Sequence, residues 1–363
     1  MGDVEPEAGI PADLGASEAA ERQAGPQVAS EDPVPQAEIR AQIGRRITWA
    51  TQQNDVPVIG EIVLANLGTE PLADLTLRLV CDPPVLGERF WPISAIAPGG
   101  ELSLFDRRVT LAGGLLAKID ERMRAELTLE LRKGETVLAE HRREIVALAH
   151  NEWGGGRHMP ELLAAFVAPN DPAVARLLKD ASEILRAAGR PGALEGYQSK
   201  SRARAWEIVS ALWTAVVRRG LTYVEPPASF ESEGQKIRLP SAVETQGLAT
   251  CLDTAVLFAA AIEEAGLNPV IVFTEGHALA GAWLQPKSLP ALAVEDVVDL
   301  RKAVDQSELV LFETTLACAD RPVTFSDAVR EARRQIDEAQ ESRFVFALDV
   351  KRARAQGIMP LPG

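Results

Sequence analysis

The hydrophobic pattern of this 363-residue chain changes its period between residues 151 and 160, and this change constrains the fold more than any other feature. Before it, short apolar runs alternate with polar residues and are separated by turn signals at 66–69 and 132–135. Such a period of two is typical of strands with one face on a core. After it, apolar residues recur at helical spacing. The pattern predicts a β-rich domain at residues 38–150 and a domain of helices and strands at 151–363.

Six segments of the first domain are predicted to be strands: 47–49, 58–67, 75–81, 102–111, 123–131 and 136–147. Strands at such regular spacing suggest an all-β sandwich that resembles an immunoglobulin-like module. Leu127, Leu129 and Leu131 alternate with polar residues, so one face of the sheet should meet a core and the other water. Cys81 lies inside an apolar run and is expected to pack as a buried strand residue.

Charge is distributed unevenly over the chain, whose net charge is −14. Residues 1–37 hold eight acids and one base with few large apolar side chains, so we expect a disordered acidic tail. The acidic balance argues against a surface that neutralises phosphates, and no direct contact with nucleic acid is expected. No apolar run is long enough to span a bilayer and no signal sequence is recognisable, so we expect a cytoplasmic protein without membrane contact.

Helices are predicted at several places in the second domain. Apolar residues at 162–167 have helical spacing, Asp171 is a candidate N-cap for a helix that reaches about Ala188, and another helix covers 201–219. The basic runs 330–334 and 351–354 are interleaved with acids, which is typical of solvated helix faces rather than of nucleic-acid contacts. Three cysteines and four histidines show no metal-ligand spacing, and neither a metal nor another cofactor is expected.

Chemistry is most strongly indicated around Cys251. Thr250 is a plausible N-cap, so Cys251 falls in the first turn of a helix that Gly266 closes. The positive end of the helix dipole favours thiolate over thiol there. His277 begins a strand after a tight turn and can exchange a proton with this thiol, as cysteine nucleophiles require. Glu313, at the end of a strand-like run 310–315, can orient the imidazole.

The third acid and the oxyanion donor have alternatives. Asp296 or Asp299 can replace Glu313 as the acid that orients the imidazole. The backbone N–H of Cys251 is one oxyanion donor, and the second is Gln235, with Tyr223 as the alternative.

Two short motifs carry a family resemblance. Gly247-x-x-Thr-Cys-Leu-Asp253 followed by Glu275-Gly-His-Ala278 resembles the transglutaminase-like branch of the papain-like cysteine enzymes. The resemblance implies an α+β domain in which cysteine starts a helix and the His and Asp/Asn lie on adjacent strands. It covers about residues 150–363. Glu313 departs from the pattern, because the family usually has Asp in a Leu-Asp-Pro-Thr context.

A narrower resemblance rests on further short sequences, namely 226–230, 233–238, 312–315 and 349–354. Together with the Cys and His motifs they are similar to the N-terminal region of large bacterial superfamily-1 helicases of a domain-of-unknown-function class. This resemblance implies a helicase module as a possible partner. The chain has no GxxxxGK[ST] motif, so helicase activity is not expected of these residues themselves.

These observations lead to one hypothesis and one competitor. The hypothesis is a cysteine-dependent amide hydrolase or acyltransferase that acts on protein or peptide through Cys251, His277, Glu313 and Gln235, with hydrolysis and transfer both left open. The competitor is a catalytically degenerate peptide-binding or protein-binding module of a helicase-linked bacterial defence or repair system.

Overall fold

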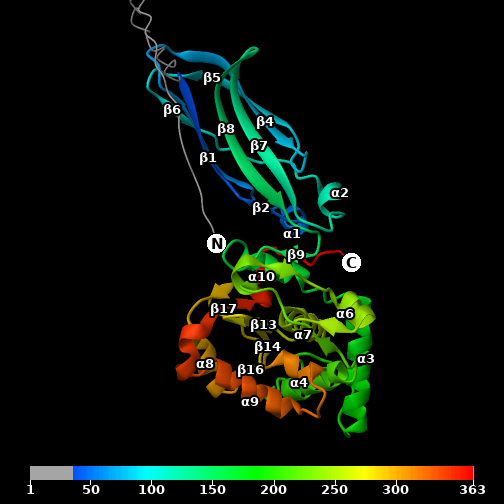
Figure 1. The fold of residues 1–363 in the computed structure, drawn as a ribbon. Helices are drawn as coiled ribbons and strands as arrows, with labels where there is room; N and C mark the ends of the chain where they lie inside the picture. Colours follow the sequence, from blue (N-terminus) through cyan, green and yellow to red (C-terminus); the bar gives the residue numbers. More distant parts are fainter. Residues whose placement is uncertain (1–35, 363) are drawn as a thin grey trace, which may run out of the picture. The chain divides into compact units, whose positions relative to one another are not determined.

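A computed structural model describes residues 36–362, which form a mixed α+β protein with an N-terminal β-rich region and a C-terminal region of helices and strands (Figure 1). The predicted acidic tail lies outside the described residues except for Gln36 and Ala37, and Ala37 is already the first residue of β1. Within residues 36–362, the helices are too short or too polar for any of them to cross a bilayer.

The β-rich region consists of two sheets around one core. Its strand orders are β1-β3-β6 and β2-β8-β7-β4-β5. The bounds are β1 (Ala37–Ile43), β2 (Arg46–Ile47), β3 (Ile59–Asn66), β4 (Leu72–Asp82), β5 (Arg89–Ile96), β6 (Glu101–Ser103), β7 (Met123–Lys133) and β8 (Thr136–Ala147), with short helices α1 (Trp49–Gln53) and α2 (Gly113–Leu116). Leu127, Leu129 and Leu131 are fully buried in this core together with Ile62 and Leu64 of the other sheet. The predicted alternation along β7 is therefore confirmed.

Two of the predicted strands were too long. Of the predicted strand 47–49, only Ile47 belongs to β2. Thr48 caps α1 instead, because its hydroxyl accepts a hydrogen bond from the Thr51 N–H at 2.9 Å. In the segment 102–111 pairing stops at Ser103, and Leu111 makes only an isolated bridge to Leu86.

Two strands of this region were not predicted, β1 and β5. The sequence of β5 contains Pro92, which weakens a strand signal but is tolerated because β5 lies at the edge of its sheet.

The C-terminal region is built on an antiparallel sheet of order β15-β17-β13-β14-β16. Its strands and helices are β9 (Glu152–Trp153), η1 (Pro160–Phe166), α3 (Pro172–Ala187), α4 (Arg202–Val217), β10 (Thr222–Tyr223), α5 (Phe230–Glu233), β11 (Gln235–Lys236), α6 (Pro240–Gln246), β12 (Leu248–Ala249), α7 (Cys251–Glu264), β13 (Pro269–Thr274), β14 (His277–Trp283), β15 (Ala293–Val294), α8 (Val297–Asp305), β16 (Leu309–Phe312), η2 (Thr314–Cys318), α9 (Phe325–Gln335), η3 (Glu338–Arg343), β17 (Phe344–Asp349) and α10 (Val350–Ala355).

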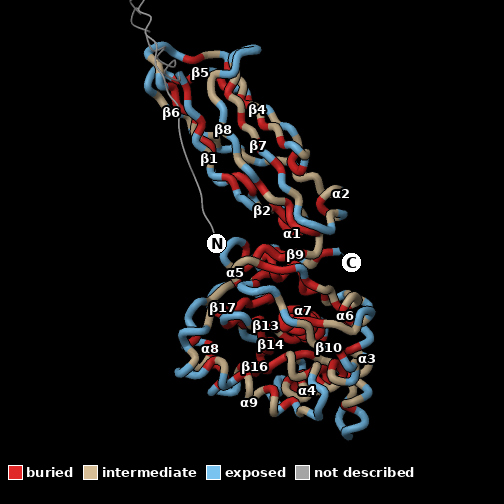
Figure 2. Tube along the Cα trace, in the orientation of Figure 1, coloured by how far each residue is buried: buried red, intermediate tan, exposed pale blue. Residues whose placement is uncertain are grey.

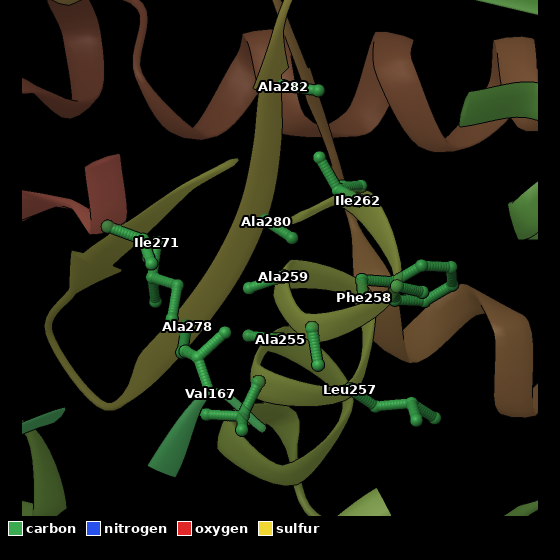
Figure 3. Close-up of a cluster of buried hydrophobic side chains, with 14 of the residues drawn as sticks. Val167, Ala255, Leu257, Phe258, Ala259, Ile262, Ile271, Ala278, Ala280 and Ala282 are labelled. Carbon is green, nitrogen blue, oxygen red and sulfur yellow. The ribbon is translucent and has the colours of Figure 1, made fainter. Parts of the chain in front are cut away.

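Helix α7 lies on one face of this sheet and is buried along almost its whole length (Figure 2). The alanines 278, 280 and 282 of β14 lie in the same hydrophobic cluster as Ala255, Ala259 and Ile262 of α7 (Figure 3). Small side chains on the strand let the helix approach the sheet closely. The alternate residues Leu279 and Trp283 join a second cluster with α8 and α9. The two faces of β14 thus pack into different clusters, and both are buried.

Most predicted helix starts in this region are confirmed. The Asp171 side chain caps α3, Ser201 caps α4 and Thr250 caps α7, in each case by accepting a hydrogen bond from a backbone N–H of the first turn. The segment 162–167 is helical but forms a 3₁₀ helix, η1. The run 310–315 is strand only as far as Phe312, because the Glu313 carboxylate caps η2.

Candidate active site

Cys251 is the first residue of α7, and the start of this helix is held by a capping box. The Thr250 hydroxyl accepts from the Asp253 N–H at 3.2 Å, and the Asp253 carboxylate accepts from the Thr250 N–H at 2.9 Å. Asp253 is fully buried and also binds the backbone and the guanidinium of Arg238, at 2.8 and 3.0 Å. These bonds fix the position of the Cys251 backbone.

Tyr223 reaches the thiol through a short parallel strand pair. Strand β10 pairs with β12 so that Tyr223 lies opposite Ala249, two residues before Cys251, and the Val224 N–H donates to the Ala249 carbonyl at 2.9 Å. The Tyr223 side chain lies close enough to the Cys251 thiol for the two groups to interact. Burial, together with the negative charges of Cys251 and Glu225, raises the pKa of Tyr223. Tyr223 therefore stays neutral and can donate a hydrogen bond.

His277 and Glu313 form the second part of the site. The His277 Nε2 and the Glu313 Oε2 lie 2.7 Å apart. Strands β14 and β16 bring them together, since Ala280 pairs with Phe312 and Glu313 directly follows that strand. Of the two alternative acids, Asp296 caps α8 by accepting from the Val298 N–H at 2.8 Å, and Asp299 lies in the first turn of the same helix. The acid beside the imidazole is Glu313.

Four donors surround the Glu313 carboxylate. Oε1 accepts from the Thr315 N–H at 2.9 Å and from the Thr315 hydroxyl at 2.7 Å, and Oε2 accepts from the Gln335 amide at 2.5 Å as well as facing His277. Burial alone would raise the pKa of this carboxyl, but the hydrogen bond and positive charge of His277 and the two Thr315 donors lower it. Glu313 is a carboxylate at neutral pH.

The imidazole of His277 links this carboxylate to the thiol. Burial alone would lower the pKa of His277, but hydrogen bonds to Cys251 and Glu313 and their negative charges outweigh burial and raise it to about 10. Because Nε2 faces Glu313, Nδ1 is the nitrogen left for the thiol. The imidazole of His277 is therefore protonated at neutral pH and faces the Glu313 carboxylate.

Gln235 lies on the other side of Thr250. Strand β11 pairs with β9, which places Gln235 opposite Trp153. Its amide Nε2 donates to the Thr250 hydroxyl at 3.0 Å, and its Oε1 is buried without a hydrogen-bond partner. Of the two predicted oxyanion donors, Tyr223 contacts Cys251 itself and Gln235 contacts the residue before it.

A cavity of about 1300 Å³ opens beside these residues. Tyr223, His277, Glu313 and Gln335 line it, and so does a charged wall made of Glu225, Glu275, Arg321, Asp327, Arg330, Glu331, Arg334, Asp337 and Arg343. Cys251 itself is fully buried and is not among the residues that line the cavity.

The sequence did not point to Gln335 or to a buried hydroxyl pair. The Thr254 hydroxyl lies 2.8 Å from that of Thr314 and 2.9 Å from the Cys251 carbonyl, which ties the first turn of α7 to η2. No motif or spacing in the sequence marks a glutamine that binds a distant carboxylate or a pair of threonines whose hydroxyls meet in the core. The basic run 330–334 was predicted as a solvated face, and Arg330 and Arg334 are indeed exposed, but they also line the cavity.

Among residues 36–362 no cluster of His, Cys, Asp and Glu side chains has the makings of a metal site. In comparisons with known proteins, no protein-family model and no curated protein matches the chain.

Proposed function

We propose that the chain is a cysteine-dependent amide hydrolase or acyltransferase that acts on protein or peptide through Cys251, His277 and Glu313. The observation that carries the proposal is the 2.7 Å contact between His277 Nε2 and Glu313 Oε2, with the Cys251 thiol close enough to the imidazole to help raise its pKa. Each group then has the chemical role that a cysteine nucleophile, its general base and the orienting acid require.

The reaction proceeds in two halves. The Cys251 thiolate attacks the amide carbonyl carbon, the imidazolium of His277 gives its proton to the leaving amine, and the C–N bond breaks to leave a thioester. Water or a second amine then attacks the thioester, His277 takes the proton of that nucleophile, and the C–S bond breaks. The choice between water and amine decides between hydrolysis and acyl transfer.

The oxyanion is stabilised at the start of α7. Backbone N–H groups at a helix N-terminus have no partner within the helix, and that of Cys251 is next to the reacting carbon. The Tyr223 hydroxyl is the second donor once it turns from the sulfur to the carbonyl oxygen. Gln235 supports the same site by holding the Thr250 hydroxyl.

The fold of the C-terminal region supports assignment to a transglutaminase-like (papain-like) domain. Helix α7 begins with the cysteine, the histidine begins β14, and the acid directly follows the neighbouring strand β16, in the order that this family shows. The two sheets of the N-terminal region, which share one core, support an immunoglobulin-like sandwich.

A catalytically degenerate binding module is the second candidate. The observation that favours it is the full burial of Cys251. In that case the charged cavity would hold a peptide or a partner such as a helicase module without bond cleavage.

A peptide mixture separates the two candidates. The protein and its Cys251→Ala variant are each incubated with peptides from digested bacterial proteins and with a biotinylated primary amine, and the products are read by mass spectrometry. New peptide ends that depend on Cys251 indicate hydrolysis, and biotin on peptides indicates transfer. Peptides retained equally by both proteins, with no product from either, would contradict the enzyme and support the binding module.

A further inference from the structure

Helix α9 holds Glu313, the acid that orients His277, at two points. The Glu313 N–H donates to the carbonyl of Ala328 at 3.0 Å, and the side-chain amide of Gln335, the last residue of α9, donates to Glu313 Oε2 at 2.5 Å. The same oxygen lies 2.7 Å from His277 Nε2. Gln335 and His277 therefore share one carboxylate oxygen and constrain it from two elements.

The helix itself is firmly seated. Ala332 of α9 and Ile336, the residue directly after the helix, are buried in the hydrophobic cluster on one face of the sheet. At the other end of α9, Phe325 packs against Phe312, the residue before Glu313, with ring centroids 5.3 Å apart. Packing next to Gln335 and packing next to Glu313 therefore both fix the position of one residue relative to the other.

A glutamate at this position needs more support than an aspartate. Its side chain has one more rotatable bond, so a free carboxylate would sample several orientations in which it does not face His277. The Thr315 donors on Oε1 restrain one oxygen, and Gln335 restrains the other. An amide is neutral, so it restrains the oxygen without pairing with the charge that His277 needs.

We propose that Gln335 is a positioning residue that holds the Glu313 carboxylate against His277, so that Nδ1 of the imidazole faces Cys251. This inference rests on the proposed function. Arg330, Glu331 and Arg334 of α9 line the cavity where a substrate would lie. The helix that forms the wall of the cavity thus also holds the acid of the triad.

The titratable groups around Glu313 determine how the role of Gln335 would change the pH profile of Cys251 alkylation. His277 on β14, Cys251 on α7, Tyr223 on β10 and Cys318 on η2 interact with it or with its partners. The charged groups on the walls of the same cavity are Glu225, Glu275, Arg321, Asp327, Arg330, Glu331, Arg334, Asp337 and Arg343.

The test measures the rate at which iodoacetamide alkylates Cys251 between pH 5 and 10, in the wild type, Gln335→Ala, Gln335→Glu and Gln340→Ala. Gln340 lines the same cavity and is the matched control. For Gln335→Ala we expect a rate about 10-fold lower at pH 7 and a rise of the rate to the wild-type level only at a higher pH, because an imidazolium that is held less well stabilises the thiolate less. Gln340→Ala should follow the wild type.

The glutamate variant gives the sharper readout. Its introduced carboxyl group donates a hydrogen bond to Glu313 only while it is protonated, so its rate relative to the wild type should be near one at pH 5 and fall as the pH rises. A ratio that does not change with pH, or a wild-type profile for Gln335→Ala, would overturn the role of Gln335 while leaving the triad intact. If the wild-type Cys251 is itself unreactive, the proposed function fails and this inference with it.

Discussion

Replacing Cys251 by alanine is expected to lower any Cys251-dependent turnover of peptides by at least about 1000-fold, because no other group in the site can form the thioester. Triad members act as a unit, so the remaining His277 and Glu313 have no nucleophile to activate. The measurement is the initial rate of product formation, with the peptide that the wild type processes fastest, at equal concentrations of folded protein.

The matched control for this substitution is Cys318→Ala. Cys318 lies at the end of η2, is partly buried and has no role in the triad. Both substitutions remove one sulfur atom from a packed position, and each should cost about 1 kcal/mol of unfolding free energy. Only the change at Cys251 should abolish turnover. Equal losses of activity in both variants would show that the effect comes from packing and not from a nucleophile.

Replacing Gly234 by alanine is expected to destabilise the C-terminal region by about 3 to 5 kcal/mol. Gly234 has a φ of +83°, and a Cβ there would lie 1.9 Å from the Trp153 carbonyl oxygen and 2.7 Å from backbone atoms of the next two residues. Backbone cannot yield as a flexible side chain does, so strain and overpacking add. The expected result is a large shift in the denaturant midpoint, with loss of the pairing between Trp153 and Gln235.

Gly189→Ala separates strain from crowding. Gly189 also has a positive φ, +69°, but nothing lies within 4 Å of the position of its Cβ. This variant should lose only the conformational cost of about 1 to 2 kcal/mol. A similar small loss for Gly234→Ala would mean that the segment before Gln235 is not tightly packed against residues 153–155.

The order of the chemistry-bearing residues was predictable from local sequence. Thr250 followed by Cys251 and an apolar helical run indicates a capped helix, and the structure has that cap. The Glu275-Gly276 turn and the alternation after His277 indicate a hairpin, and β13 and β14 form it. Such signals depend only on residues close together in the sequence, so they can be recognised without knowledge of the tertiary fold.

Contacts between distant segments were not predictable in the same way. The choice of Glu313 over Asp296 as the partner of His277 depends on which strand pairs with β14, and Asp296 instead caps α8. Gln335 meets Glu313 only because α9 packs under the sheet. The register of the two-residue strands β10 and β12 brings Tyr223 close to Cys251. Strands this short have no recognisable hydrophobic pattern in the sequence.

The most direct test of the account is the alkylation of the folded protein by iodoacetamide, followed separately at Cys251 and Cys318 by mass spectrometry. Burial raises the pKa of Cys318 to about 11, so only about one molecule in ten thousand carries its thiolate at pH 7. We expect Cys251 to react at least about 100-fold faster than Cys318 at pH 7, and to lose most of this advantage in His277→Ala. Equal and slow reaction of the two cysteines in the folded wild type, with rapid labelling only after denaturation, would contradict an activated nucleophile at Cys251.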